Sequence, residues 1–396
     1  MNRVEGAWNW LTVSPRRLLL SCLTVAVLLA VPGLFTGAFV DDYFHIATIE
    51  RMLPFGSPWG LFDFAPGDPA VLTPRIAHGP FPWYTLPEMK ARFFRPLSSA
   101  LSVADHAVFG RHLIWWHLHS VLWYLLLIAA CQRVFLRTLP GPVAVLALVL
   151  FTVDDVHWFP TVWLANRNAL VAVSCALWGF VAHLRWREDG WKPGLPLSLA
   201  GYAAGLCGGE AALGVLAYVP AYELLGAPGR WPSRLRGFLP AAMVAICYLG
   251  IYKALGYGSF GSGSYIDPVA EPLSYLAHAP SRIMQLIAGQ LLGFPIDLSV
   301  FMLWLRPVDT VAGIAACVVA GILLYRMWPR IEAREQRALR WMIPGALLSL
   351  LPVAATFPTG RLLLSASLGG SVVVACILAD WWRNRRVLRG RRWTAV

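Results

Sequence analysis

Long apolar runs, separated by short polar or basic segments, recur along nearly the whole chain. About 20 consecutive apolar residues in a helix can cross the roughly 30 Å hydrocarbon core of a bilayer. On that criterion the pattern predicts about ten membrane-spanning helices, at residues 18–40, 113–136, 141–160, 168–186, 195–208, 211–225, 238–256, 308–328, 341–357 and 362–382. We therefore expect an all-α fold, a polytopic transmembrane helix bundle with a single domain over residues 1–396.

One nearly continuous apolar stretch, residues 195–225, is too long for a single span. As one helix it would be about 46 Å long, which exceeds the thickness of the hydrocarbon core. Gly208 and Gly209 interrupt it, so we predict two short helices that together return the chain to the side from which it came.

A second apolar stretch, residues 283–305, is interrupted by Pro295 and Asp297. If it crossed the membrane, the arginine-rich residues 326–340 that follow would lie on the outer face. We therefore predict an interfacial or re-entrant segment here instead of a further span.

The loop that follows the first span is much longer than the predicted cytoplasmic loops. It covers residues 41–112, and loops of this length are usually functional or disordered. This one is too aromatic and apolar to be disordered, so we expect it to fold onto the outer membrane surface. Short amphipathic helices are predicted at 42–53 and 96–110, and a second outer loop at about 257–307.

Composition supports the membrane assignment and excludes an ordinary soluble domain. The chain is 58% hydrophobic and 14% charged, with a mean hydropathy of +0.59, whereas soluble domains carry about 25% charged residues. Seven cysteines occur without CxxC spacing, which predicts neither a disulfide framework nor a zinc site. The first apolar segment lacks a small-x-small cleavage site, so we interpret it as a retained span.

The net charge of +12 is distributed unevenly across the predicted topology. With both termini in the cytoplasm, the inner segments hold 22 of the 33 Lys and Arg and seven of the 21 acids, a net charge of +15. The remaining residues have 11 bases and 14 acids, a net charge of −3. This is the positive-inside pattern of a plasma membrane protein, which we expect to be a bacterial inner-membrane protein. The basic tail 383–396 is predicted to contact anionic lipid, and its short, tryptophan-interrupted runs argue against nucleic acid.

Two adjacent acids, Asp41 and Asp42, directly follow the first span. On a helix that begins here, Asp41 and His45 would share a face. A carboxylate at a dry, aromatic membrane surface has a raised pKa and can act as a general base. The alternative is a helix cap that places negative charge at the positive end of the helix dipole. The pattern does not choose between Asp41 and Asp42.

Two arginines stand at predicted helix starts on the outer side. Arg95 precedes Pro96, where a guanidinium and free backbone N–H groups could bind a phosphate together. Arg361 begins the last span, where its charge opposes the helix dipole and favours a specific anionic partner. The alternative for both is an anchor to lipid headgroups.

Other outer residues are candidates for a supporting role. Glu210 follows Gly209 and needs a partner, for which Arg167 and Arg361 are candidates, and the alternative is a purely structural ion pair. The turn before Arg167 carries three further polar residues, Asp154, Asp155 and His157. Their spacing does not make a recognisable metal site, and ordinary turn and cap chemistry is the alternative. A divalent metal is therefore not predicted.

The order of these segments resembles the C-type glycosyltransferase (GT-C) fold. Similar proteins are the protein O-mannosyltransferases and their bacterial and tetratricopeptide-bearing relatives. The resemblance rests on spaced short segments over most of residues 35–380, namely the Asp-Asp pair, FFRPLSSALSVADHAVFG with HLHSVLWYLLL, VHWFPTVWLANRNALVA, GGEAALGVLAYVPAYELL and RLLLSASLGG.

The resemblance implies a reaction and roles for the residues. Asp41 or Asp42 would deprotonate an acceptor, which attacks the anomeric carbon of a sugar carried by polyprenyl phosphate. The acceptor would be a lipid, a glycan or a protein. The departing phosphate would be held by Arg95, Arg167 and Arg361, with Glu210 orienting one of them.

The chain also departs from the family pattern. Gly209 stands where the relatives have Lys, and the segment around Ser367 lacks their Tyr and Pro. Two alternatives therefore remain: a transporter or flippase for a lipid-linked glycan, and a non-catalytic scaffold with the GT-C fold. Against a transporter, no inverted repeat and no paired mid-span charges are recognisable.

Overall fold

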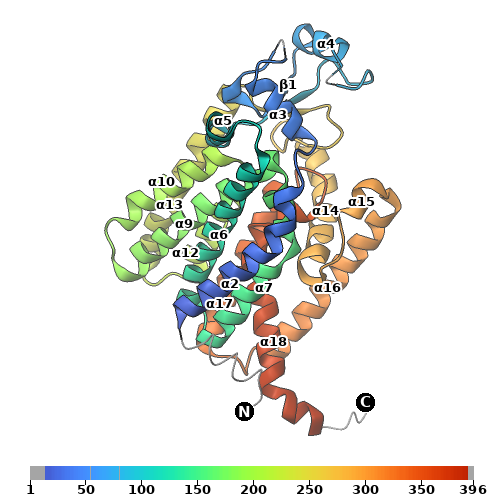
Figure 1. Cartoon of the computed structure of the whole chain (residues 1–396). Coiled ribbons are helices and arrows are strands. Elements are labelled where there is room, and N and C mark those ends of the chain that lie inside the picture. The colour runs from blue at the N-terminus through green and yellow to red at the C-terminus, as the bar shows by residue number, and fades with distance from the viewer. Residues whose placement is uncertain (1–13, 54, 80, 391–396) are drawn as a thin grey trace.

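The computed structural model describes residues 14–390 apart from Pro54 and Pro80, with side chains described as far as Arg385. The last part of the predicted lipid-binding tail, 391–396, lies outside the described residues. Most of the described chain is helical (Figure 1). The long helices are α2 (Pro15–Ala30), α6 (Leu113–Thr138), α7 (Gly141–Val153), α9 (Arg167–Asp189), α10 (Gly194–Gly208), α13 (Trp231–Ala254), α14 (Pro272–Leu292), α16 (Arg306–Met327), α17 (Ala333–Val353) and α18 (Ala366–Gly390).

Shorter elements connect or cover these helices. The short α-helices are α3 (Asp41–Ile49), α4 (Pro69–Ala77), α5 (Pro96–Phe109), α8 (Trp158–Val162), α11 (Ala212–Leu216), α12 (Tyr218–Leu225) and α15 (Leu298–Phe301). The 3₁₀ turns are η1 (Val31–Phe35), η2 (Pro58–Gly60), η3 (Asp155–His157), η4 (Leu164–Asn166), η5 (Leu303–Leu305) and η6 (Gly360–Leu363). Three short strands complete the structure: β1 (Asp63–Pro66), β2 (Lys90–Arg92) and β3 (Gly258–Phe260).

The helices form an apolar bundle suited to a membrane. Within the described residues, five helices are long and apolar enough to cross a bilayer, and a sixth span results if α7 and the bent segment Asp155–Val162 are counted together. Only 17% of the most apolar window of α13, and of α16, is buried inside the protein. Large exposed apolar surfaces of this kind need a non-aqueous neighbour. The prediction of an all-α membrane bundle is therefore confirmed at this level, and each of the ten apolar segments overlaps a helix.

The break predicted within 195–225 is present. Helix α10 ends at Gly208, and α11 and α12 follow after a turn. A stripe of small residues lets α10 lie directly against α9, because a Cβ placed on Gly201 would stand only 2.6 Å from the Cα of Gly179. Close backbone approach through glycines is a common way for helices to associate in membranes.

The segment predicted to be interfacial or re-entrant, 283–305, is part helix and part irregular, and its position relative to the membrane stays a prediction. Its first ten residues belong to α14, a 21-residue helix that packs along α16. The helix ends because Gly293 adopts a left-handed conformation (φ 62°), which glycine does without steric cost. Only the remainder, with α15 and η5, forms an irregular return to α16.

The two long loops meet at one end of the bundle, which we call the loop end. There α3, α4, α5 and β1 lie together, opposite the end where α18 finishes (Figure 1). A three-stranded antiparallel sheet in the order β1-β2-β3 joins loop 41–112 to loop 257–307. The apolar pattern did not predict this sheet, because strands of three or four residues are too short to show an alternation.

Candidate active site at the loop end

Asp42 is held by the backbone at the start of α3. Its two carboxylate oxygens accept hydrogen bonds from the N–H of Phe39 (2.9 Å) and the N–H of Ala165 (2.6 Å). The side chain is 2% exposed, and burial raises the pKa of Asp42 to about 6 in spite of these hydrogen bonds. Asp42 therefore ties the start of α3 to η4, and both its oxygens are already used by the protein.

Asp41 has the opposite character. It is partly buried, and its carboxylate makes no hydrogen bond or ion pair with the residues that the structure describes. Burial raises the pKa of Asp41, and the charges of Arg361 and Arg95 offset part of that rise. A desolvated carboxylate with a raised pKa and free oxygens is suited to accept a proton. The structure thus separates two neighbours that the sequence could not separate.

The structural role of Asp42 predicts a stability effect. Asp42→Ala leaves two backbone N–H groups unpaired in the interior, which should lower the free energy of unfolding by about 1–3 kcal/mol. Asp42→Asn retains one acceptor and should recover part of that loss. Thermal unfolding of the purified protein in detergent measures both variants, and an unchanged midpoint in Asp42→Ala would contradict the role.

Arg95 is oriented by a carboxylate, an amide and two aromatic rings. Its Nε donates to Glu210 Oε2 at 2.7 Å, and its guanidinium lies over the rings of Phe62 and Phe93 at 4.8 and 4.7 Å. In the orientation that satisfies both ends of its amide, Asn168 accepts from Arg95 Nη1 at 3.0 Å. Glu210 is thus paired with Arg95, whereas the sequence pointed to Arg167 or Arg361.

Arg361 carries a charge without an acidic partner. It lies on η6, just before α18, and stacks over the rings of Trp163 (4.8 Å) and Phe357 (5.7 Å). Its Nε donates only a long hydrogen bond to the Thr359 hydroxyl (3.4 Å). No carboxylate among the described residues lies within ion-pair distance of Arg361. The remaining donors of its guanidinium are available to an anion.

Arg167 pairs with Asp105 and not with Glu210. It is 2% exposed and forms an ion pair with the buried Asp105 at 2.5 Å. It also donates to the Trp116 carbonyl and the Ser102 hydroxyl, both at 3.3 Å, while His119 contacts the same carboxylate at 2.7 Å. Both of its Nη atoms are therefore engaged inside the bundle, which favours a structural role for Arg167, and the phosphate contact suggested by the sequence stays a prediction.

The supporting histidines are packing residues. His45 is buried with its ring 4.8 Å from that of Phe62, and burial lowers its pKa to about 3, so it is neutral. It makes no hydrogen bond to Asp41, contrary to the pairing suggested by their spacing. His157 is buried against Phe151, whose carbonyl lies 2.7 Å from its Nε2.

The acids of the same turn have separate roles. Asp154 accepts from the N–H of Val156 at 3.3 Å, which is the turn and cap chemistry considered above. Asp155 is exposed and lies within electrostatic range of Asp297. The described residues contain no group of three or more His, Cys, Asp or Glu placed to hold a metal ion.

Asp297 is a site residue that sequence reasoning missed. It accepts from the N–H of Gly360 at 3.1 Å and lies within electrostatic range of Arg361, and burial raises its pKa. In the sequence, Asp297 only interrupts an apolar run, and no periodic pattern relates residue 297 to residue 361. By contrast, Asp105 could have been found, because Ser98, Ser102 and Asp105 form a polar stripe at helical spacing on α5.

The loop end therefore brings together Asp41, Arg95, Glu210 and Arg361, with Asp42 behind them. Comparison of the chain with protein-family models, with curated proteins and with solved structures found no match. The geometry of these side chains is consequently the basis for a functional proposal, together with the short segments already described.

Proposed function

We propose that this chain is a membrane glycosyltransferase of the GT-C type. It transfers a sugar from a polyprenyl-phosphate donor to a hydroxyl or amine acceptor, and the active site is the cluster at the loop end. One observation supports this most directly: a carboxylate with free oxygens and a raised pKa, Asp41, lies within electrostatic range of two arginines, Arg95 and Arg361. A base beside an anion-binding pair matches the needs of this reaction.

In the proposed reaction, the acceptor transfers its proton to Asp41 as its oxygen or nitrogen attacks the anomeric carbon. The bond from that carbon to the phosphate oxygen breaks, and the lipid phosphate leaves with the electron pair. The leaving phosphate gains negative charge in the transition state, so cations that are already in place stabilise it. Arg361, which has no ion-pair partner among the described residues, would be the principal phosphate ligand.

Arg95 would contribute in a different way. Glu210 neutralises part of its charge, while Glu210, Asn168 and the flanking rings hold its guanidinium in one orientation. In the same amide orientation, a Cβ on Gly209 would stand 3.0 Å from the Asn168 side-chain oxygen that accepts from Arg95. The glycine at this position, where the family has lysine, therefore leaves room for the Asn168 side chain that orients Arg95.

The charge asymmetry supports an orientation for the bundle. We infer that the loop end faces the outside of a bacterial inner membrane, with both termini in the cytoplasm. Helices α10, α17 and α18 and the pair α11–α12 would complete the about ten predicted spans by packing against the more apolar helices. The donor lipid would then reach the site from the outer leaflet.

The direct test is donor turnover. The purified protein in detergent would be incubated with a panel of polyprenyl-phosphate sugars, and sugar release would be measured with and without lipid, glycan and peptide acceptors. Release from at least one donor is expected. A folded protein that releases sugar from none of them would favour the transporter or the non-catalytic scaffold, and donor binding would then be measured.

The pH dependence gives a second prediction. Asp41 must be ionised to act as base, so turnover should fall as pH drops through its pKa, which burial raises above the ordinary 3.8. Arg361 lowers that pKa, so Arg361→Gln should move the acidic limb of kcat/KM to higher pH. Arg51→Gln is the control, since Arg51 is an exposed arginine of the same loop. A limb that stays in place, or moves to lower pH, would contradict the role of Asp41.

A further inference from the structure

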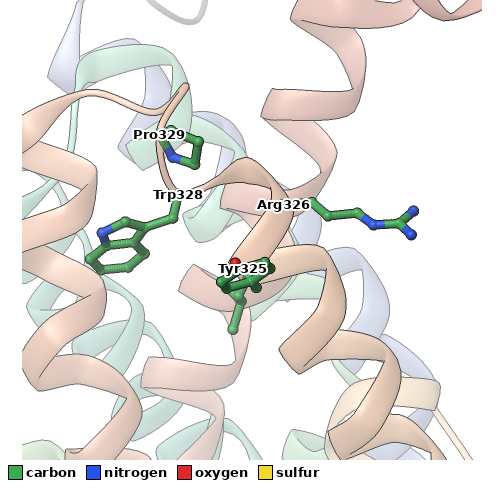
Figure 2. A pocket seen from close by; sticks show the side chains of 5 residues that line it. Tyr325, Arg326, Trp328 and Pro329 are labelled. Atoms are coloured by element: carbon green, nitrogen blue, oxygen red, sulfur yellow. The ribbon is translucent and has the colours of Figure 1, made fainter.

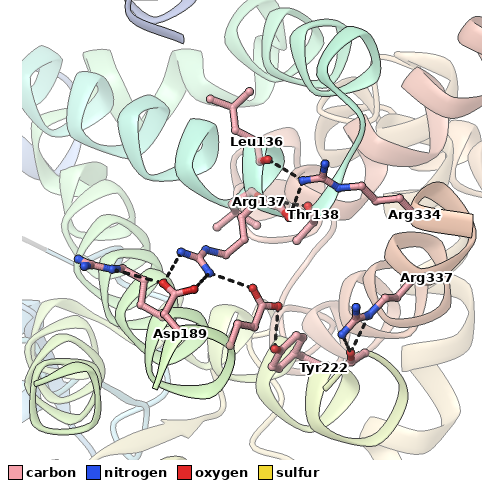
Figure 3. Close-up of polar contacts among 11 residues, drawn as sticks. Leu136, Arg137, Thr138, Asp189, Tyr222, Arg334 and Arg337 are labelled. Atoms are coloured by element: carbon pink, nitrogen blue, oxygen red, sulfur yellow. Dashed lines mark hydrogen bonds and ion pairs between the residues drawn. The ribbon is translucent and has the colours of Figure 1, made fainter. Parts of the chain in front are cut away.

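At the end of the bundle opposite the loop end, a hollow of about 580 Å³ opens between four helices. It is bounded by the last turn of α6, the end of α9, α12 and the first turns of α17 (Figure 3). Its walls include Trp341 and Ala338, which are apolar, and three arginines, Arg137, Arg334 and Arg337. Apolar and cationic side chains thus line the same hollow, together with one acid, Glu188.

Two of these arginines are positioned by backbone carbonyls. Nη2 of Arg334 donates to the carbonyls of Leu136 (3.0 Å) and Arg137 (2.9 Å) at the end of α6. Nε and Nη2 of Arg337 both donate to the carbonyl of Gly226 (3.0 and 2.9 Å) after α12. Figure 3 shows both side chains extending from α17 toward these neighbouring segments. Carbonyls orient a guanidinium but do not neutralise its charge.

The acids near the hollow are already used. Arg137 pairs with Glu188 (3.0 Å) and Asp189 (2.7 Å), and the hydroxyl of Tyr222 donates to Glu188 at 2.9 Å. Among the residues that the structure describes, no carboxylate lies within ion-pair distance of Arg334 or Arg337. Two positive charges therefore remain on the rim, with guanidinium donors left over.

A second hollow at the same end lacks this arrangement. It measures about 550 Å³ and is lined by the end of α16 and the turn after it. Arg326 points away from the Trp328 ring (Figure 2). Tyr325 is 83% exposed. Of these two hollows, only the one beside α17 is lined by arginines that carbonyls of neighbouring segments orient.

We propose that the hollow between α6, α9, α12 and α17 binds the phosphate headgroup of an anionic phospholipid. The helix ends place it at the rim of the membrane, where basic pockets between helices recognise such headgroups. Arg334 and Arg337 bind the phosphate, and the glycerol lies in the hollow beside the apolar wall that includes Trp341. Because the carbonyls hold both guanidiniums in advance, little side-chain entropy is lost on binding. The site does not depend on the reaction at the loop end.

Native mass spectrometry tests the proposal. The whole protein would be exchanged into micelles that contain equimolar phosphatidylglycerol and phosphatidylcholine, and the retained lipid would be counted. Wild type should retain phosphatidylglycerol preferentially. Each Arg→Gln change removes roughly 1 kcal/mol of headgroup attraction, so the apparent affinity should fall about fivefold in Arg334→Gln and about 25-fold in Arg334→Gln/Arg337→Gln.

Three comparisons keep the result interpretable. Arg340→Gln, on the same helix but stacked on Trp328, should retain lipid as wild type does. Arg334→Lys/Arg337→Lys retains the charge and should lose less affinity than the Gln pair, which separates binding from misfolding. Inorganic phosphate is the third arm, titrated in neutral detergent.

Specific outcomes would overturn the proposal. Equal retention of phosphatidylglycerol by wild type and the double Gln variant would do so, and so would an equal loss in Arg340→Gln. If inorganic phosphate bound through the same two arginines while lipid retention stayed unchanged, the hollow would be a site for a soluble phosphate instead.

Discussion

Asp41→Asn should lower sugar release from the polyprenyl-phosphate donor by about two to four orders of magnitude, the usual contribution of a general base. The amide occupies the same space but cannot accept the acceptor's proton. The carboxylate makes no hydrogen bond to the described residues, so its replacement should leave the fold and the donor affinity nearly unchanged. The loss should therefore appear in kcat, with little change in the KM for the donor.

The measurement is single-turnover sugar release by purified wild type and variant, with unfolding midpoints recorded in parallel. Asp68→Asn is the matched control, because Asp68 is an exposed helix cap of α4 in the same loop and Asn caps a helix equally well. Wild-type turnover in Asp41→Asn would remove Asp41 from the mechanism. Asp297, the other partly buried acid near Arg361, would then be the next residue to replace.

Arg167→Gln should destabilise the protein by about 3–5 kcal/mol, because it removes the guanidinium that pairs with the buried Asp105 carboxylate and leaves only His119 beside it. The two side chains are only 3% and 5% exposed, so water cannot replace the lost contact. This is the largest stability effect that we expect from one substitution. It would lower activity through the folded fraction, without changing the donor KM of the protein that remains folded.

Unfolding in a denaturing detergent measures this effect. The double variant Arg167→Gln/Asp105→Asn removes the uncompensated charge and should recover most of the loss. A full recovery of stability together with full turnover would confirm the structural role. If Arg167→Gln instead left stability unchanged and raised the KM for the donor, Arg167 would be a phosphate ligand, as the sequence had suggested.

Much of the fold could be predicted because a membrane-spanning helix can be recognised from its own stretch of sequence. An apolar run of sufficient length has few alternatives in a bilayer, where every backbone polar group must be bonded within its own segment. The break at Gly208 could be predicted for the same reason, because an apolar run that is too long for one span must contain a turn. The sheet that joins the two loops was not visible, because residues 65 and 91 and residues 91 and 259 pair across long separations.

The candidate site was only partly predictable. Ionisable residues next to apolar runs are costly, so the sequence identified Asp41, Arg95, Glu210 and Arg361 as residues that need an explanation. Their partners could not be predicted. Glu210 pairs with Arg95, which is 115 positions earlier in the chain. Such a choice depends on which helices are neighbours, which no local pattern encodes.

The sequence by itself determined the environment of this protein, a membrane, and its helical architecture. It also indicated two long loops at one face and a positively charged opposite face. Only the tertiary structure decided which acid of the site has oxygens without hydrogen bonds and which arginine of the site has no ion-pair partner among the described residues. The physical reason is that burial and pairing are properties of a place in the fold. Asp41 and Asp42 have the same chemistry and adjacent positions, yet the N–H of Ala165 engages one of them and leaves the other available.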